Sequence, residues 1–193
     1  MATLKLNSYE LFTQSENNRP EFGAGVPSGM LMNVVQSVKR DTQQVGGNSS
    51  TYESSEEITG LSVTITPKLQ VSNFLITVVI HVGASGGQEG LHFRLFKNGS
   101  VISGAQGDTS NSGTNKDRNF LHIGAHYTSN EMYPATGLYL DNNTGVSPIT
   151  YSIRAKGYTT GYPGWINRAE VEQNDNTSYS RPISTITVME IAA

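Results

Sequence analysis

From Met30 onward, apolar and polar residues alternate in short runs that are separated by turn-forming residues. Alternation with a period of two predicts β-strands, because successive side chains of a strand point to opposite faces. In ITGLSVTITP (58–67), for example, Leu61, Val63 and Ile65 alternate with serine and threonine. No window keeps a helical periodicity of useful length, so the pattern predicts an all-β fold.

Runs of strand character recur along the rest of the chain. They are MLMNVVQSVKR (30–40), NFLITVVIHVG (73–83), LHFRLF (91–96), FLHIGAHYT (120–128), TGLYLD (136–141), ITYSIRAKG (149–157) and GWINRAEV (164–171). The run 73–83 is apolar on both faces, which predicts a central strand that is covered on both sides. Asn98-Gly99 is the strongest short hairpin signal. About eight to ten short strands without a helix predict an antiparallel, jelly-roll-like β-sandwich.

The last predicted strand, 183–191, lies almost at the C-terminal end of the chain. One of its faces carries Ile183, Thr185, Thr187, Met189 and Ile191, and the other carries Ile186, Val188 and Glu190. We expect one face to join the core and the other to meet a neighbouring subunit or sheet. Such a strand would lie inside a sheet and be paired on both sides.

Residues 1–28 differ in composition from the rest of the chain. Their apolar residues are scattered among prolines, glycines and polar residues, so the segment cannot bury enough surface to fold alone. We expect an extended N-terminal arm, with a loose tail as the alternative, followed by one β domain at 29–193. The arm would anchor the protein on a partner through its larger apolar side chains, which are Leu4, Leu6, Tyr9, Leu11 and Phe12.

The overall composition is typical of a turn-rich β protein. Hydrophobic residues make up 36% and charged residues 15% of the 193 residues, and the net charge of −3 is too small to favour disorder. With 13 basic against 16 acidic residues, binding to nucleic acid is not expected. The chain has no cysteine, no signal-peptide core and no membrane-length apolar run, so we expect no disulfide, secretory leader or membrane insertion.

Patterns that match catalytic or calcium sites are weak. GASGG (83–87) matches a nucleophile elbow around Ser85, but that elbow requires a following helix, and a strand pattern follows here. DNNTG (141–145) lacks the further ligands of a calcium loop and predicts a turn. We therefore expect no catalytic residue, no metal ligand and no cofactor.

The histidines do not form a recognisable metal motif. His122 and His126 lie too far apart on a strand to share one metal ion easily. His81 and His92 could face each other across adjacent strands, but no carboxylate is positioned to complete a site. A metal on a symmetry axis, with one histidine from each subunit, stays open as an alternative.

Aromatic residues gather late in the chain, among glycine, asparagine and aspartate. They are Tyr158, Tyr162, Trp165 and Tyr179. Aromatic faces beside amide and carboxylate groups suit sugar rings, which stack on one face and form hydrogen bonds through their hydroxyls. Subunit interfaces and loop anchors also favour tyrosine and tryptophan. Packing or an interface is the favoured interpretation, and contact with a glycan or host molecule stays open.

Five segments, in their order along the chain, resemble one domain family. They are PSGMLMNVVQSVKRDT, EITGLSVTITPK, SNFLITVVIHVG, FRLFKNGSVISG and SRPISTITVMEIA. The family is a β-sandwich virion structural module of tailed phages, especially of marine and cyanobacterial hosts, that occurs at the C-termini of tail fibres or as a short surface protein. The resemblance spans about residues 27–193. It implies a trimeric, non-enzymatic domain on the outside of a phage particle.

This chain departs from the tail-fibre version because no long shaft or coiled coil precedes the domain. That difference favours a compact homotrimer that residues 1–28 dock to capsid or tail proteins at the virion surface, after assembly in the bacterial cytoplasm. It would decorate or stabilise the particle or present a host-contact surface. The alternative is a receptor-binding module that binds host glycans through the aromatic loops. An enzyme such as a polysaccharide depolymerase is disfavoured, because no pair of acids can be assigned.

Overall fold

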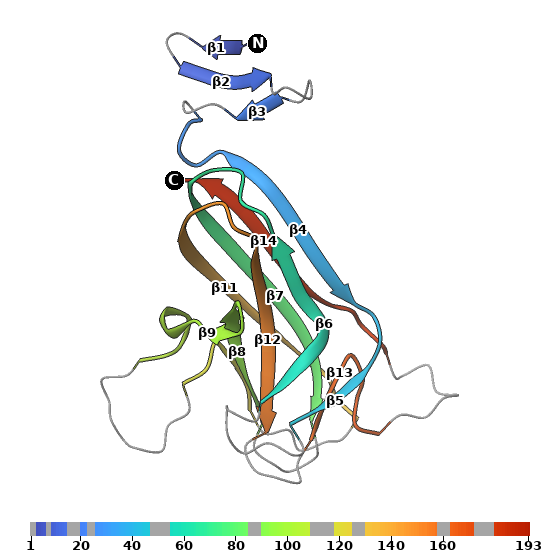
Figure 1. Cartoon of the computed structure of the whole chain (residues 1–193). Coiled ribbons are helices and arrows are strands. Elements are labelled where there is room, and N and C mark those ends of the chain that lie inside the picture. Colours follow the sequence, from blue (N-terminus) through green and yellow to red (C-terminus); the bar gives the residue numbers. More distant parts are fainter. Residues whose placement is uncertain are drawn as a thin grey trace.

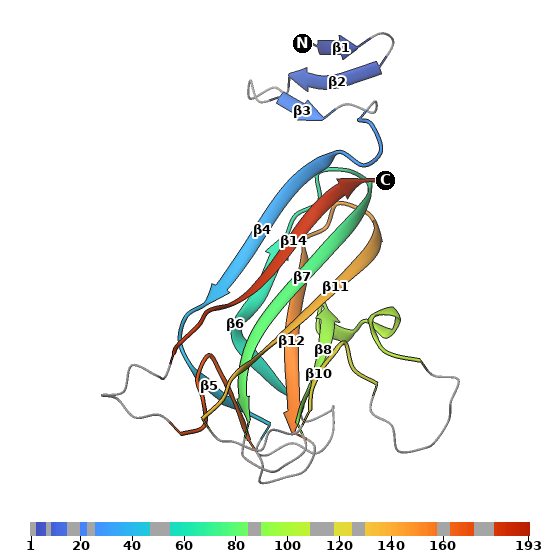
Figure 2. The same cartoon turned by 180° about the vertical axis from the view of Figure 1, so that it is seen from behind.

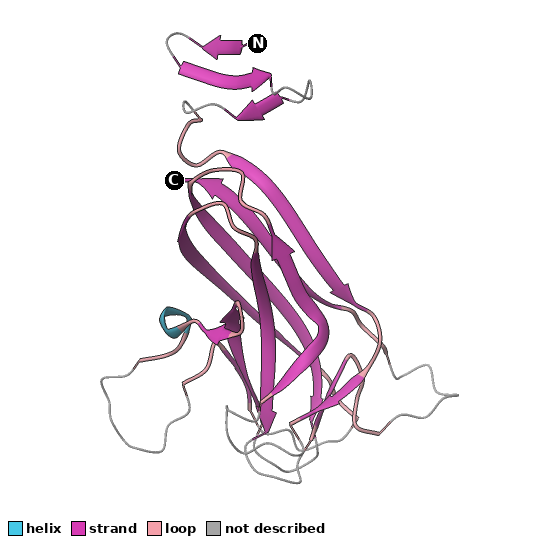
Figure 3. Ribbon diagram, in the orientation of Figure 1, coloured by secondary structure: helices cyan, strands magenta, loops and turns pink. Residues whose placement is uncertain are grey.

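The structure is a computed structural model that describes residues 3–6, 9–14, 20–22, 26–46, 55–84, 90–108, 118–124, 130–157, 163–171 and 180–193. Within these residues the chain forms β-strands and one short 3₁₀ turn, and no α-helix (Figure 3). The strands are β1 (Thr3–Leu6), β2 (Tyr9–Gln14), β3 (Pro20–Phe22), β4 (Leu31–Lys39), β5 (Gln43–Val45), β6 (Glu56–Ile65), β7 (Val71–Ala84), β8 (Leu91–Lys97), β9 (Ser100–Val101), β10 (Leu121–Ile123), β11 (Tyr133–Thr144), β12 (Ile149–Gly157), β13 (Gly164–Ile166) and β14 (Ser184–Ala192). The all-β fold that the alternation predicts is confirmed.

The number of strands is larger than the eight to ten that the sequence predicts, since the described residues form fourteen. The additional strands are short. Three of them, β1, β2 and β3, lie in the segment that was expected to be extended, and β5 contains only three residues. A strand of three residues is too short to show an alternating pattern, so the sequence does not reveal it.

The strands form three antiparallel sheets (Figure 1). β1, β2 and β3 make a small sheet of their own. The five-stranded sheet has the order β10-β8-β12-β6, with β9 beside β8. The six-stranded sheet has the order β4-β14-β7, with β11 on the other side of β7. β13 pairs with the C-terminal end of β7, and β5 pairs with β13.

The pairing in the two larger sheets is nested. β4 pairs with β14, β6 with β12, β7 with β11 and β8 with β10, so that the first of these eight strands pairs with the last, and so on inward. The type I′ geometry expected of a two-residue hairpin is present between β8 and β9, where Asn98 and Gly99 have φ values of 49° and 80°.

The facing sides of the two larger sheets share one hydrophobic core. Phe74, Ile76 and Ile80 of β7 pack in it with Phe93 and Leu95 of β8, and all five are almost fully buried. Burial of a side chain of this size stabilises a fold by roughly 1.5–3 kcal/mol. Because burial is favourable for the apolar residues alone, the alternation of apolar and polar residues in each strand determines which side chains face the core.

The terminal strand lies inside the six-stranded sheet, as the sequence predicts. β14 pairs along its length with β4 on one side and with β7 on the other. Ile186 and Val188 are fully buried in the core. The end of the strand is also held, because Ala192 N donates to Met30 O (2.9 Å) and Gly29 N donates to Ala192 O (2.8 Å).

Glu190, on the inner face of β14, is fully buried. Its carboxylate accepts hydrogen bonds from Lys68 N (2.8 and 2.9 Å), Leu69 N (3.1 Å) and Ser72 Oγ (2.7 Å). Hydrogen bonds to a charged acceptor are among the strongest in proteins, and they satisfy backbone donors that would otherwise be buried without partners. The last strand thus fixes the turn between β6 and β7.

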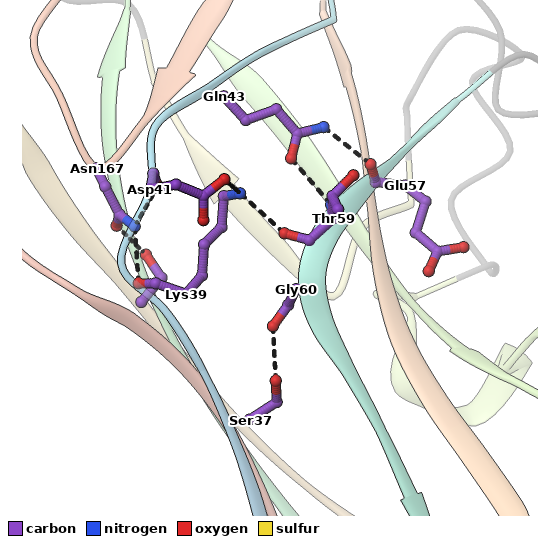
Figure 4. A network of polar contacts seen from close by, with 9 residues as sticks. Ser37, Lys39, Asp41, Gln43, Glu57, Thr59, Gly60 and Asn167 are labelled. Atoms are coloured by element: carbon purple, nitrogen blue, oxygen red, sulfur yellow. Dashed lines mark hydrogen bonds and ion pairs between the residues drawn. The ribbon is translucent and has the colours of Figure 1, made fainter.

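Polar side chains close the seam between β4 and β6 (Figure 4). Ser37 Oγ donates to Gly60 O (2.7 Å). The buried Lys39 Nζ donates to Thr59 O (2.8 Å) and forms an ion pair with Asp41 Oδ2 (2.9 Å). The hydrogen bond from Lys39 holds the pKa of the Asp41 carboxyl below its usual range.

A second polar contact joins the layers near β11. Asp141 Oδ2 accepts from Tyr151 Oη (2.6 Å) and from Lys97 Nζ (2.7 Å), so β8, β11 and β12 meet at one carboxylate. Burial, together with the hydrogen bond to Asp141, raises the pKa of the Tyr151 hydroxyl far above its usual range. Tyr151 therefore stays protonated and acts as the donor.

Candidate interaction surfaces

The side of the six-stranded sheet that faces away from the core is named here the uncharged face. Its residues are Leu31, Val34, Gln36 and Val38 of β4, Thr185, Thr187, Met189 and Ile191 of β14, Val71, Asn73, Leu75, Thr77, Val79 and His81 of β7, and Pro134, Thr136, Leu138, Leu140, Asn142 and Thr144 of β11. None of these outward positions is aspartate, glutamate, lysine or arginine.

The register aligns the side chains of the uncharged face in rows across four strands. In one row Val34 lies opposite Met189, Met189 opposite Leu75, and Leu75 opposite Leu140. In the next row Gln36 Nε2 donates to Thr187 Oγ1 (2.8 Å). The face therefore presents a continuous apolar row beside a row of neutral polar side chains, two of which, Gln36 and Thr187, are hydrogen-bonded to each other.

Within one chain, no described strand covers the uncharged face, and Figure 2 looks onto it from the open side. Leu138 is 62% exposed and Leu140 51% exposed. The prediction that the strand at 73–83 is covered on both sides is thus wrong for the single chain, since Leu75 and Val79 of β7 are only partly buried.

Of the four aromatic residues proposed to contact glycans, the structure describes Trp165. Tyr158, Tyr162 and Tyr179 lie outside the described residues. Trp165 is half-buried on β13, where it is paired with Gly83 and Gln44. The guanidinium carbon of Arg168 lies 5.6 Å from the centre of its ring. That the four aromatic side chains form one glycan-binding site stays a prediction.

The proposed anchor residues fall on the small N-terminal sheet. Leu4 is 59% exposed and lies opposite Phe12 in the pairing of β1 with β2. Leu6 pairs with Tyr9 in the same ladder. The side chains of Leu6, Tyr9, Leu11 and Phe12 lie outside the described part of the structure.

The histidines are arranged differently from the sequence interpretation. His81 is on β7 in the six-stranded sheet and His92 is on β8 in the five-stranded sheet, so the two do not face each other across adjacent strands. His92 instead lies opposite His122 of β10, with ring centres 4.8 Å apart. In the described parts of the chain, no group of three or more His, Asp or Glu side chains is placed to hold a metal ion. His126 lies outside them.

The nucleophile-elbow pattern and the calcium-loop pattern do not lead to a site. Ser85 lies outside the described residues, so the elbow pattern is not placed. The predicted turn at 141–145 is wrong for most of its length, because β11 continues to Thr144 and only Gly145, with φ 120°, leaves the strand. The Asp141 carboxylate accepts hydrogen bonds from Tyr151 and Lys97 and has no partner typical of a calcium loop among the described residues.

Sequence reasoning missed the buried polar residue Asn167. It has a left-handed backbone (φ 61°), donates through Nδ2 to Lys39 O and Asp41 O (2.9 and 3.1 Å), and accepts from Ser184 Oγ (2.6 Å). Asparagine is among the few residues that adopt this backbone readily, and it ends β13 inside the run predicted as one strand. An asparagine directly after GWI was the available signal.

No model of a known protein family matches the sequence, and no curated protein matches it. Among the described residues there is also no helix long and apolar enough to cross a membrane.

Proposed function

We propose that the protein is a non-enzymatic structural protein of a phage virion that assembles into a homotrimer through its uncharged face. The observation that carries this proposal is the continuous, partly exposed sheet face without a charged side chain. The trimeric state and the phage origin come from the resemblance of residues 27–193 to virion β-sandwich modules.

The nested strand order supports a jelly-roll β-sandwich as the finer description of the fold. In a jelly roll, eight strands wind as two Greek keys, and the pairing of first with last and second with seventh is what this winding produces. β4-β14 and β6-β12 occupy those positions here. Jelly rolls build many viral capsid and lectin domains, which agrees with a virion role.

Physical chemistry explains why such a face suits a subunit interface. The centre of a stable interface is depleted in charged residues, because a charge that loses its water without a partner costs much free energy. Monomeric proteins also rarely expose a large contiguous apolar patch. The row from Val34 to Leu140 would bury against the same row of neighbouring subunits.

Residues 1–28 are the proposed link to other virion proteins of the capsid or tail. They would hold the trimer on the particle through Leu4, Leu6, Tyr9, Leu11 and Phe12, while the β domain decorates or stabilises the surface or meets the host. A particle carrying the protein without residues 1–28 tests this link. We expect the truncated protein to form trimers and to be missing from purified virions, and its normal incorporation would contradict the anchoring role.

A receptor-binding module for host carbohydrate is the second candidate. It is favoured by Trp165, whose ring is half-buried beside the Arg168 guanidinium, an arrangement that can stack against a sugar ring. Glycan-array binding that is lost on Trp165→Ala and on Tyr162→Ala would support this site. Binding that survives both substitutions would exclude it.

A further inference from the structure

The two outer strands of the uncharged face are β4 and β11, and β14 and β7 lie between them (Figure 2). Among the described residues, each of these outer strands pairs with a strand on one side only. The other side of such a strand carries a row of backbone N–H and C=O groups that have no strand partner within the chain. The two rows are named here the β4 edge and the β11 edge.

The hydrogen bonds of the sheet identify the residues whose backbone groups point outward at the β11 edge. Gly145 N donates to Gln70 O (2.6 Å), directly beyond the last pair of β11 with β7. In an antiparallel ladder, residues that bond to the partner strand alternate with residues whose N–H and C=O point away from it. Steps of two back from Gly145 give the residues bonded to β7, and those between them point outward. They are Pro134, Thr136, Leu138, Leu140, Asn142 and Thr144.

Two further features agree with this assignment. His81 N of β7 donates to Ser184 Oγ (3.0 Å) at the start of β14, so the odd-numbered residues of β7 point away from β11. Proline has no N–H and is tolerated in a sheet where that position points away from the ladder, as it does at Pro134. The same alternation, followed across β7 and β14, gives the outward residues of the β4 edge. They are Val34, Gln36 and Val38.

The free side of β6 shows how this molecule protects an edge that stays unpaired. Side chains from β4 and β5 bond to its backbone (Figure 4). Gly60 O accepts from Ser37 Oγ (2.7 Å), and Thr59 O accepts from Lys39 Nζ (2.8 Å). Thr59 N donates to Gln43 Oε1 (2.9 Å). In the described structure no side chain caps the β4 or β11 edge in this way, and none of their outward residues is lysine, which commonly guards an exposed edge.

We propose that the β11 edge pairs with the β4 edge of a second copy of the chain, so that backbone hydrogen bonds join neighbouring subunits. This inference rests on the homotrimer proposed above and adds how its subunits meet. Three antiparallel pairings separate β4 from β11, so the two strands run in opposite directions. Copies related by rotation about an axis along the strands therefore bring β11 beside β4 in antiparallel orientation, as in every other pair of this sheet.

Two different edges are what a closed ring of identical subunits requires, because each subunit meets its two neighbours through opposite sides. Pairing of β11 with β11 of another copy would give a two-fold dimer instead. The outward residues at both edges are uncharged, so the pairing buries no charge. It also extends the uncharged face, because Leu140 of one copy and Val34 of the next would lie on one continuous face.

Proline substitution at Leu138 tests the pairing, because Leu138 N points outward near the middle of the β11 edge. Leu138→Pro removes this N–H and leaves the bonds from β11 to β7 in place. Leu138→Ala is the matched control, since it also removes the leucine side chain but keeps the N–H. Sedimentation equilibrium of the full-length proteins measures assembly. We expect Leu138→Pro to assemble at least tenfold more weakly than Leu138→Ala, because each joint between copies loses a hydrogen bond.

Amide hydrogen exchange of the wild type is the second measurement, and it decides the matter even if Leu138→Pro does not fold. We expect the N–H groups of Leu138 and Leu140 to exchange slowly in the assembled protein. Fast exchange there, or equal assembly of the folded Leu138→Pro and Leu138→Ala, would overturn the edge pairing, while a trimeric wild type would still support the proposed assembly. A monomeric wild type would overturn both. A dimer with slow exchange would overturn the assignment to the β4 edge.

Discussion

The two layers of this protein turn similar faces inward and very different faces outward. Inside, both sheets contribute apolar residues to one core. Outside, the long strands of the six-stranded sheet carry valine, leucine, methionine and threonine without aspartate, glutamate, lysine or arginine, whereas the outward side of the five-stranded sheet carries the charged residues Arg94, Arg154 and Glu57. Alternation alone therefore identifies which residues are buried within a chain. The chemistry of the outward residues is what distinguishes the two layers.

The largest expected effect concerns the strand that supplies both an inner face and the uncharged face. Deletion of residues 183–193 removes β14 from between β4 and β7 and takes away its core residues Ile186 and Val188. We expect the truncated chain to fail to fold and to be recovered only as insoluble protein. A soluble truncation with a strand-rich circular dichroism spectrum would show that the layer does not need its central strand.

The next effect separates the inner face of β14 from its outer face. Glu190→Ala leaves the buried donors of Lys68, Leu69 and Ser72 without an acceptor, so the free energy of unfolding should fall by about 3 kcal/mol. Glu190→Gln keeps one carbonyl oxygen and should lose less. Urea unfolding at a fixed protein concentration measures both variants. Equal stability of Glu190→Ala and wild type would show that this carboxylate is not what holds the turn.

The smallest effect concerns the seam between the layers rather than either face. Because Lys39 lowers the pKa of Asp41 below its usual 3.8, the carboxylate stabilises the fold above that value and loses its contribution as the pH falls through the lowered pKa. Its side chain is 73% exposed, so water and salt screen the pair and the effect is small. We expect Asp41→Asn to be slightly less stable than wild type at pH 7 and equal to it at pH 2, as measured by urea unfolding. If Asp41→Asn and wild type still differ in stability at pH 2, the loss of the ion pair with Lys39 is not the cause of the difference.

Much of the fold follows from the sequence, because alternation is a local signal. The run ITYSIRAKG gives β12 with its observed bounds, and the inward and outward residues of β14 are those that the pattern predicts. The order of strands in the sheets cannot be predicted in the same way. β4 and β14 are separated by most of the chain, and no local sequence pattern indicates that they pair. For the same reason the pairing of His92 with His122 was not foreseen.

The uncharged face was only half visible in the sequence. The sequence shows that the runs 73–83 and 183–191 carry apolar residues on both faces. For the terminal run it also predicts that one of these faces points away from the core. What the sequence could not provide is the alignment of Val34, Met189, Leu75 and Leu140 in one row. A row is a property of the sheet, because it depends on register between distant strands.

The most direct test measures the solution mass of the intact protein by sedimentation equilibrium, together with two matched variants. Leu140→Lys places a charge in the central row of the uncharged face, whereas Val101→Lys places one on the outer side of the five-stranded sheet, where Val101 is 38% exposed. We expect trimers for wild type and Val101→Lys, and monomers with an unchanged circular dichroism spectrum for Leu140→Lys. A monomeric wild type, or a Leu140→Lys variant that still forms trimers, would contradict assembly through the uncharged face.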